Sequence, residues 1–233
     1  MDSDGEYQQI LNEGLAFESL KSKRNYYFSC QGSGEEDFGN QKHPPQLNEM
    51  AFLPVNKEAS VQAANAYNIR YEITKNAKIP HFHGWTLGEF LLAGARLGDV
   101  ENWKYDWNQL LPSVYVDKEF IQIYETSRAQ SEAFYTTTNG LVVNSILDGL
   151  VTTWWGKLEI AKCMPWEGKV SFGNIRTVLG VGVDGVIENG KAEITVTAWK
   201  DCSIEFYGEQ LDMKKGEIRN CSLDLKLEKV TIE

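Results

Sequence analysis

The chain has 233 residues, of which 42% are hydrophobic and 12% aromatic, a composition typical of a globular protein and not of a disordered one. Its formal net charge is −10 and it has no dense run of Lys and Arg, which excludes the usual basis for binding nucleic acid or an anionic membrane. No run of about 18 apolar residues is present, so the sequence predicts no membrane-spanning helix.

The first residues lack the features of an export signal. Residues 1–6 are acidic and contain no apolar stretch, so either the protein is intracellular or Met1 is not its natural start. The four cysteines are widely spaced and include no CxxC pair, which favours buried thiols over a zinc site or a disulfide framework.

The N-terminal region is predicted to alternate between helices and loops. Residues 6–23 have the apolar spacing of an amphipathic helix, and residues 26–30 are aromatic and favour a strand. Residues 31–54 form a long irregular connection, in which Pro44 and Pro45 exclude a helix. A connection of that length is more often functional than accidental.

Three further helices are expected before residue 112. Residues 57–75 carry an Ala-rich face, residues 85–97 are followed by a Gly suited to a helix C-terminus, and residues 100–111 are expected to end at Pro112. Residues 115–134 are ambiguous, and there we expect loop with one strand at most.

Residues 139–155 give the clearest helical pattern in the chain. One apolar stripe is predicted to be buried, consisting of Val143, Ile146, Leu147, Leu150, Val151 and Trp154. From Lys157 onward the period becomes two, as in half-buried strands. Asn189-Gly190 predicts a type I′ hairpin, and the alternation in the last strand breaks before Val230.

These patterns predict an α+β multidomain chain. Residues 1–156 would form an incomplete helical domain, and residues 157–233 an antiparallel β-sandwich-like domain.

The three histidines lie in loops that precede helices. His81 and His83 would share one side of an extended segment, as metal ligands do, but no third ligand stands at suitable spacing. Hydrogen bonding to backbone or solvent is the simpler interpretation, and substrate contact is the alternative. No Gly-rich phosphate loop or nucleophile elbow is present, so we expect neither a metal nor another cofactor.

Trp85 is the strongest candidate for binding a ligand. Placed at a helix start, its ring can stack on the apolar face of a sugar, while nearby polar side chains contact the hydroxyls, and core packing is the competing interpretation. The candidate substrate-binding residues are His43, Gln46, Asn48, His83, Trp85, Glu89 and Asn139.

The order of these motifs resembles the family-95 glycoside hydrolases, the α-L-fucosidase group. Residues 84–99, with GWT and ARLGD, are similar to that family's GWS…ARLGD helix, and residues 43–54 to its His-rich loop that closes on LYP. Residues 139–156 and 158–165 resemble its DGNFGG and GEIHLLPALP segments, and the family also has a C-terminal β domain.

This resemblance implies the C-terminal portion of an (α/α)₆-barrel glycosidase, with a partial helical toroid that hydrolyses a glycosidic bond, of the α-L-fucoside type. The family's catalytic acid and paired asparagines lie N-terminal to everything present here, and its DGN carboxylate falls at Thr137. The catalytic residues therefore remain unidentified, and we expect the lone chain to be inactive or weakly active.

Carbohydrate is the partner that the resemblance implies. The exposed helix faces would contact a missing N-terminal half or a second copy of the chain. Full-length relatives are expected to be periplasmic or secreted.

Two alternatives remain open. The chain would be a non-catalytic carbohydrate-binding or interaction protein if its β domain supplies the binding. It would be a small independent enzyme if residues 35–37, an acidic run more typical of a solvated loop, supply a general acid.

Overall fold

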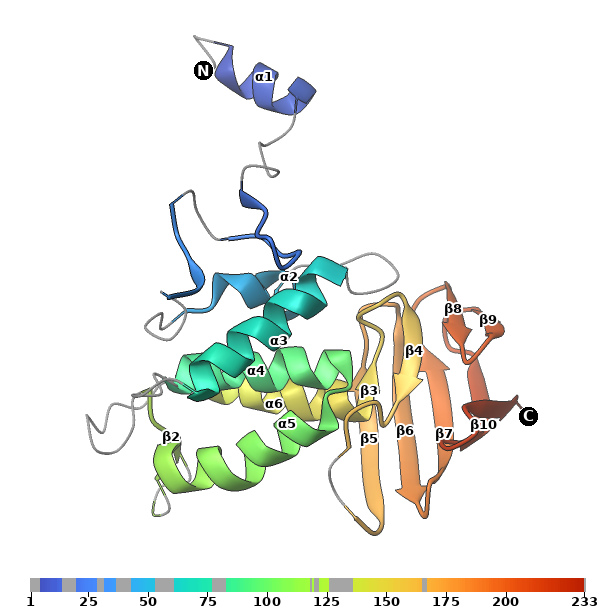
Figure 1. Ribbon diagram of the computed structural model, residues 1–233. Helices are drawn as coiled ribbons and strands as arrows, with labels where there is room; N and C mark the ends of the chain where they lie inside the picture. The colour runs from blue at the N-terminus through green and yellow to red at the C-terminus, as the bar shows by residue number, and fades with distance from the viewer. Residues whose placement is uncertain are drawn as a thin grey trace.

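The computed structural model describes residues 5–13, 20–28, 32–36, 43–52, 61–76, 83–117, 119, 122–125, 136–164 and 167–232, an α+β arrangement of helices followed by sheets (Figure 1). The helices are α1 (Glu6–Glu13), the 3₁₀-helix η3 (Pro45–Leu47), α2 (Asn48–Ala51), α3 (Val61–Asn76), α4 (Gly84–Leu97), α5 (Val100–Tyr105), the π-helix η4 (Asp106–Tyr115) and α6 (Thr136–Leu150). No described helix is both long and apolar enough to span a membrane.

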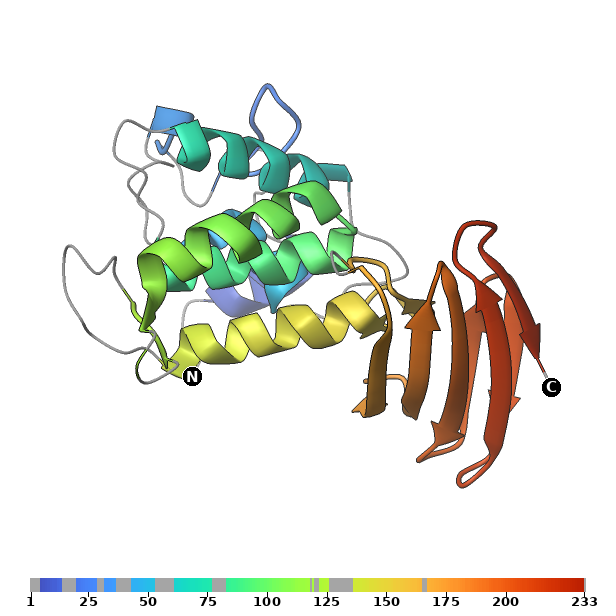
Figure 2. The same ribbon diagram turned by 90° about the horizontal axis from the view of Figure 1, so that it is seen from below.

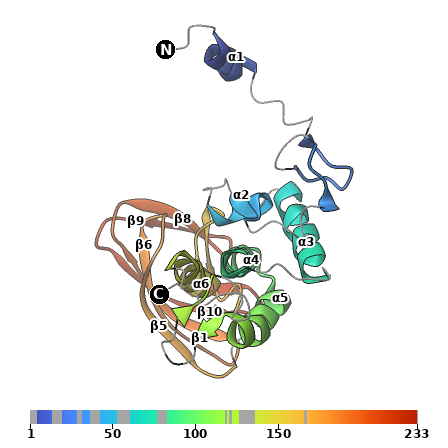
Figure 3. The same cartoon turned by 90° about the vertical axis from the view of Figure 1, so that its left-hand side faces the viewer.

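Helix α4 is the centre of the helical part. It is buried along almost its whole length, with α6 on one side and α3, α5 and η4 on the other (Figures 2 and 3). Gly98 ends it in the left-handed conformation, at φ 78°, which confirms the predicted stop. Asp99 then begins α5 by accepting a hydrogen bond from the backbone N–H of Asn102.

Two tyrosine–carboxylate hydrogen bonds attach α3 to the segment that contains α5. The Tyr67 hydroxyl donates to Asp99 at 3.0 Å, and the Tyr71 hydroxyl donates to Asp106 at 2.8 Å. Asp106 is buried, and burial raises its pKa to about 7, against the opposing effects of Tyr71 and Lys75. A buried hydrogen-bonded network of this kind fixes the two helices relative to each other.

Three predictions for the N-terminal half, two helix ends and one strand, are wrong. Residues 20–28 hold turns and one isolated bridge between Lys21 and Tyr27, so neither the helix to residue 23 nor a strand over 26–28 forms. The fourth helix does not end at Pro112, because its hydrogen bonding widens into η4 and carries the chain past the proline to Tyr115. The strand expected within residues 115–134 forms, as one half of a short antiparallel pair, β1 (Val116–Asp117) and β2 (Gln122–Ile123).

Helix α6 has the predicted period, and the predicted buried stripe is confirmed at Leu150 and Val151 but wrong at Val143 and Leu147. Val143 is 53% exposed and Leu147 37% exposed, and the helix ends at Leu150, five residues earlier than predicted. The buried residues are Thr138, Leu141, Val142, Ser145, Gly149 and Leu150. Gly88 on α4 lies against Leu141, and Gly149 on α6 lies against Cys163, so these elements approach α6 closely. This close packing determines which side of α6 faces inward.

We expect the α4–α6 contact to be sensitive to single methyl groups. A Cβ added at Gly88 would lie 2.8 Å from the Leu141 Cβ, so Gly88→Ala should lower the free energy of unfolding by about 1–3 kcal/mol. Gly140→Ala is the control, because Gly140 is an exposed residue of α6 and a Cβ added there has no neighbouring atom within 4 Å. Since Ala favours helix over Gly, this variant should be neutral or stabilising. Urea unfolding of both variants tests this, and equal stabilities would contradict it.

Two sheets follow the helices. Their strands are β3 (Val151–Thr152), β4 (Lys157–Ile160), β5 (Val170–Arg176), β6 (Val181–Glu188), β7 (Lys191–Ala198), β8 (Cys202–Phe206), β9 (Glu209–Met213), β10 (Ile218–Asp224) and β11 (Lys229–Ile232). The five-stranded sheet has the order β11-β10-β7-β6-β5 and the four-stranded sheet the order β3-β4-β8-β9. Buried side chains from both sheets belong to one apolar cluster.

Most of the β predictions are confirmed. Asn189 and Gly190 both have positive φ, 54° and 76°, and Glu188 pairs with Lys191, as a two-residue type I′ hairpin requires. The break before Val230 is the turn between β10 and β11. The expected antiparallel arrangement holds for the described strand pairs except β4 and β8, which pair in parallel.

The predicted boundary between residues 156 and 157 cuts through shared structure. Val151 and Thr152 already pair with β4, and Trp155 and Cys163 belong to the core of the helical part. The helical part also does not show a closed toroid among the described residues, where six α-helices are present.

Candidate functional site

Three aromatic side chains meet at the N-terminus of α4. Trp85, in the first turn, lies with its ring centroid 5.2 Å from that of His43 and 6.1 Å from that of Phe52. Trp85 is half-buried, whereas His43 and Phe52 are exposed. We call these three residues the Trp85 cluster. They present an apolar aromatic surface to solvent, in which each ring supports the next.

Glu89 lies one helical turn after Trp85, in the interior. It is 2% exposed, and Arg70 on α3, which is fully buried, exerts an attractive charge on it. Burial nevertheless raises the pKa of Glu89 to about 8, against the opposing effects of the Trp85 indole and the Arg70 charge. Its Oε2 atom has no hydrogen-bond partner in the described part of the chain. At neutral pH this side chain is therefore mainly a neutral carboxylic acid.

The other predicted binding residues are spread around this point. Gln46 is buried on η3 and lines a cavity of about 150 Å³ between η3 and α3. Asn48 is exposed at the start of α2, and His83 precedes α4 in extended conformation, half-buried. Asn139 is half-buried in the first turn of α6. The structure thus brings His43, Trp85 and Glu89 together, and for the remaining residues substrate binding stays a prediction.

Glu35, from the acidic run, is occupied by local contacts. It accepts hydrogen bonds from Arg24 and from the Tyr26 hydroxyl, both at 2.8 Å. Asp37 and His81 lie outside the described residues. Within the described ranges, no three His, Cys, Asp or Glu side chains gather in a way that could hold a metal ion.

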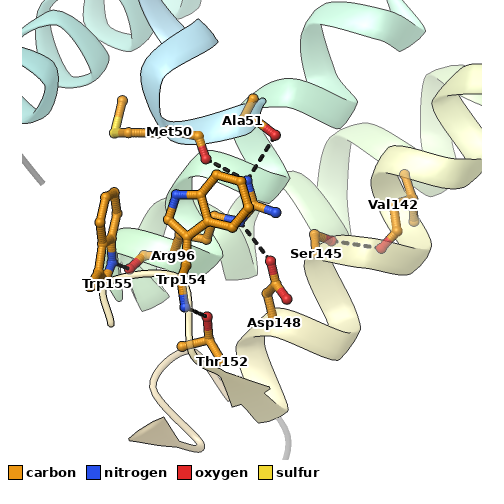
Figure 4. Close-up of polar contacts among 9 residues, drawn as sticks. All are labelled: Met50, Ala51, Arg96, Val142, Ser145, Asp148, Thr152, Trp154 and Trp155. Carbon is orange, nitrogen blue, oxygen red and sulfur yellow. Dashed lines mark hydrogen bonds and ion pairs between the residues drawn. The ribbon is translucent and has the colours of Figure 1, made fainter. Parts of the chain in front are cut away.

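A second polar cluster, which sequence reasoning missed, lies where the helices meet the sheets. Arg96 on α4 donates through Nε to Asp148 on α6 at 2.6 Å, and through Nη1 to the carbonyls of Met50 and Ala51 at 2.5 and 2.8 Å (Figure 4). Its guanidinium lies over the Trp154 ring, 3.4 Å from the centroid. We call Arg96, Asp148 and Trp154 the Arg96 cluster.

The surroundings of this cluster are well ordered by hydrogen bonds. Trp155 donates from Nε1 to the Arg96 carbonyl at 2.7 Å, and the Trp154 backbone N–H donates to Thr152 at 3.1 Å (Figure 4). Burial raises the pKa of Asp148, and the nearby Arg96 charge opposes that shift. A signal for the cluster existed in the sequence, since Arg96 is the one cation of a mainly apolar helix, α4.

A cavity of about 210 Å³ opens beside the Arg96 cluster. We call it the junction cavity, because α4, α6, β3 and the end of β5 all contribute to it. Its lining residues are Arg96, Asn144, Asp148, Val151, Thr152, Thr153, Trp154, Arg176, Thr177 and Val178.

No protein-family model matches the sequence, and no curated protein matches it either.

Proposed function

We propose that this chain is the sugar-binding C-terminal part of a glycosidase-type protein, with a carbohydrate bound against the Trp85 cluster. The observation that supports this most directly is the solvent-facing aromatic surface that Trp85 forms with His43 and Phe52. A pyranose ring offers its apolar C–H groups to such a surface.

Glu89 supports this surface from the interior. It is 2% exposed, so its carboxyl lies behind the Trp85 cluster and does not contact a ligand bound there. Burial raises its pKa to about 8, and the interaction with the Trp85 indole opposes that shift. We assign Glu89 to positioning Trp85 and not to catalysis, because glycoside hydrolysis needs two carboxyls flanking the same bond.

Hydrolysis would need more than this chain provides. The carboxylate that the resemblance places at Thr137 is replaced by a hydroxyl, and Thr137 lies exposed in the first turn of α6. In the proposed toroid, further helices would cover the exposed apolar side chains Val143 and Leu147 of α6. The proposed activity, hydrolysis of a glycoside of the α-L-fucoside type, therefore belongs to the assembled protein.

We expect Trp85→Ala to abolish sugar binding. Thermal unfolding of the full chain is measured with L-fucose, D-galactose, D-glucose and D-xylose at millimolar concentration, and at least one should raise Tm. Trp85→Ala should lose that shift, since it removes the stacking surface, while Trp199→Ala should keep it. Trp199 is the matched control, because it is 44% exposed and lies just after β7, in the β part.

The same experiment separates the proposal from its alternative. If no monosaccharide shifts Tm, the Trp85 site is not a sugar site. If the shift survives Trp85→Ala and disappears in Trp199→Ala, the β part supplies the binding, as in a non-catalytic carbohydrate-binding protein.

A further inference from the structure

The junction cavity contains a buried cation whose hydrogen-bonding capacity is not exhausted. Arg96 is 6% exposed, and its Nε and Nη1 atoms are satisfied by Asp148 and two backbone carbonyls. The remaining guanidinium nitrogen, Nη2, has no hydrogen-bond partner among the described residues. The same holds for the second carboxylate oxygen of Asp148, Oδ1. Donors and an acceptor are thus held in fixed positions at the wall of a cavity.

The cavity has an excess of positive charge. Arg96 and Asp148 neutralise each other at 2.6 Å, but Arg176, at the end of β5, also lines the cavity and forms no ion pair with any described residue. A cavity with one uncompensated cation stands out in a chain whose net charge is −10. It favours an anion, and guanidinium groups match carboxylates in geometry.

The rest of the lining is suited to hydroxyl groups. Thr152, Thr153, Thr177 and Asn144 supply hydroxyl and amide groups, and the Trp154 ring adds an aromatic wall already packed on Arg96. The volume of about 210 Å³, in a cavity that is partly open to solvent, accommodates a ligand of monosaccharide size.

We propose that the junction cavity binds a small hydroxylated carboxylate, the chemical class of a sugar acid. Its carboxylate lies between Arg176 and Nη2 of Arg96, and its hydroxyls contact the Thr and Asn side chains of the wall. Because the wall combines α4 and α6 with β3 and β5, the ligand joins the helical and β parts. This site is separate from the Trp85 cluster and does not depend on the function proposed there.

Titration calorimetry of the full-length Trp85→Ala chain with D-glucuronate tests the proposal, because this variant lacks the stacking surface of the sugar site proposed above. D-Glucose is the neutral control with the same ring, and acetate is the carboxylate control without the hydroxyls. We expect glucuronate to bind, acetate to bind at least tenfold more weakly, and glucose to give no heat at this site. Arg176→Gln should weaken glucuronate binding at least tenfold, because it removes a charge-assisted contact from an exposed position.

One further variant completes the design. Lys229→Gln removes one exposed positive charge from β11, at the opposite edge of the same sheet, and should leave binding unchanged. Because every titration is made in the Trp85→Ala chain, the binding measured reports on the junction cavity and not on the proposed sugar site. The proposal is overturned if glucuronate does not bind, if Arg176→Gln binds as well as Lys229→Gln, or if acetate binds as tightly as glucuronate.

Discussion

Replacing Glu89 by Gln is expected to remove a large part of the pH dependence of stability. The folded-state pKa of Glu89 is about 8 against 4.5 for a free side chain, so between these values the folded protein holds a proton that the unfolded chain has lost. The stability that this proton provides is fully present below pH 4.5 and is lost as the pH rises through 8. At 1.36 kcal/mol per unit, the shift corresponds to roughly 5 kcal/mol.

Urea unfolding at pH 5, 6, 7 and 8.5 measures this effect. Burial also raises the pKa of Asp106, to about 7, so Asp106 contributes mainly to the fall in stability below pH 7. Of these two groups, Glu89 therefore accounts for most of the change above pH 7. There the free energy of unfolding should fall steeply in the wild-type chain and much less in Glu89→Gln. Glu72→Gln, an exposed change on α3, should follow the wild type. Parallel curves for wild type and Glu89→Gln would refute the assignment.

Replacing Arg96 by Met is expected to lower the free energy of unfolding by about 3–5 kcal/mol. The Arg96 side chain is 8% exposed and Asp148 24% exposed, so removal of the cation leaves a largely buried carboxylate without its partner. The carbonyls of Met50 and Ala51 lose their donor as well. Methionine keeps much of the apolar stem, so the loss reports on the guanidinium itself.

An exposed ion pair in the same chain provides the comparison. Arg24 contacts Glu35 at 2.8 Å, but the two side chains are 48% and 30% exposed, so Arg24→Met should cost less than ~1 kcal/mol. In the double variant Arg96→Met, Asp148→Asn, no unpaired charge remains, so part of the loss should be recovered. If Arg96→Met unfolds at the same urea concentration as Arg24→Met, the Arg96 cluster does not hold the junction together.

The features that could be predicted from the sequence are those determined by a few neighbouring residues. The run of apolar residues in α4 with Gly98 after it, and the Asn189-Gly190 turn, carry their signals within a few neighbouring residues. The Trp85 cluster was half anticipated, because Trp85 and His43 both stood out, while Phe52 did not. The burial of Glu89 against Arg70 depends on how α3 packs on α4, which periodicity does not report.

What could not be predicted depends on contacts distant in sequence. The buried face of α6 is determined by a close approach to α4, where Gly88 meets Leu141, and small residues carry little hydrophobic signal. The Arg96 cluster joins residues 46 positions apart on one side and 52 on the other. The sequence near Arg96 or near Asp148 contains no signal that identifies the other residue as its partner, so this ion pair could not be predicted.

The direct passage from α6 into β3 has a mechanical consequence. Leu150 is the last residue of the helix and Val151 the first of the strand, so no linker intervenes at which the two parts could rotate or be cleaved. A protein cut at residue 157 would leave β4 as a bare sheet edge and would open the apolar cluster that contains Leu150 and Val151. The helices and sheets are therefore expected to unfold in a single cooperative transition, and a β fragment intended for glycan-binding assays should begin before Val151.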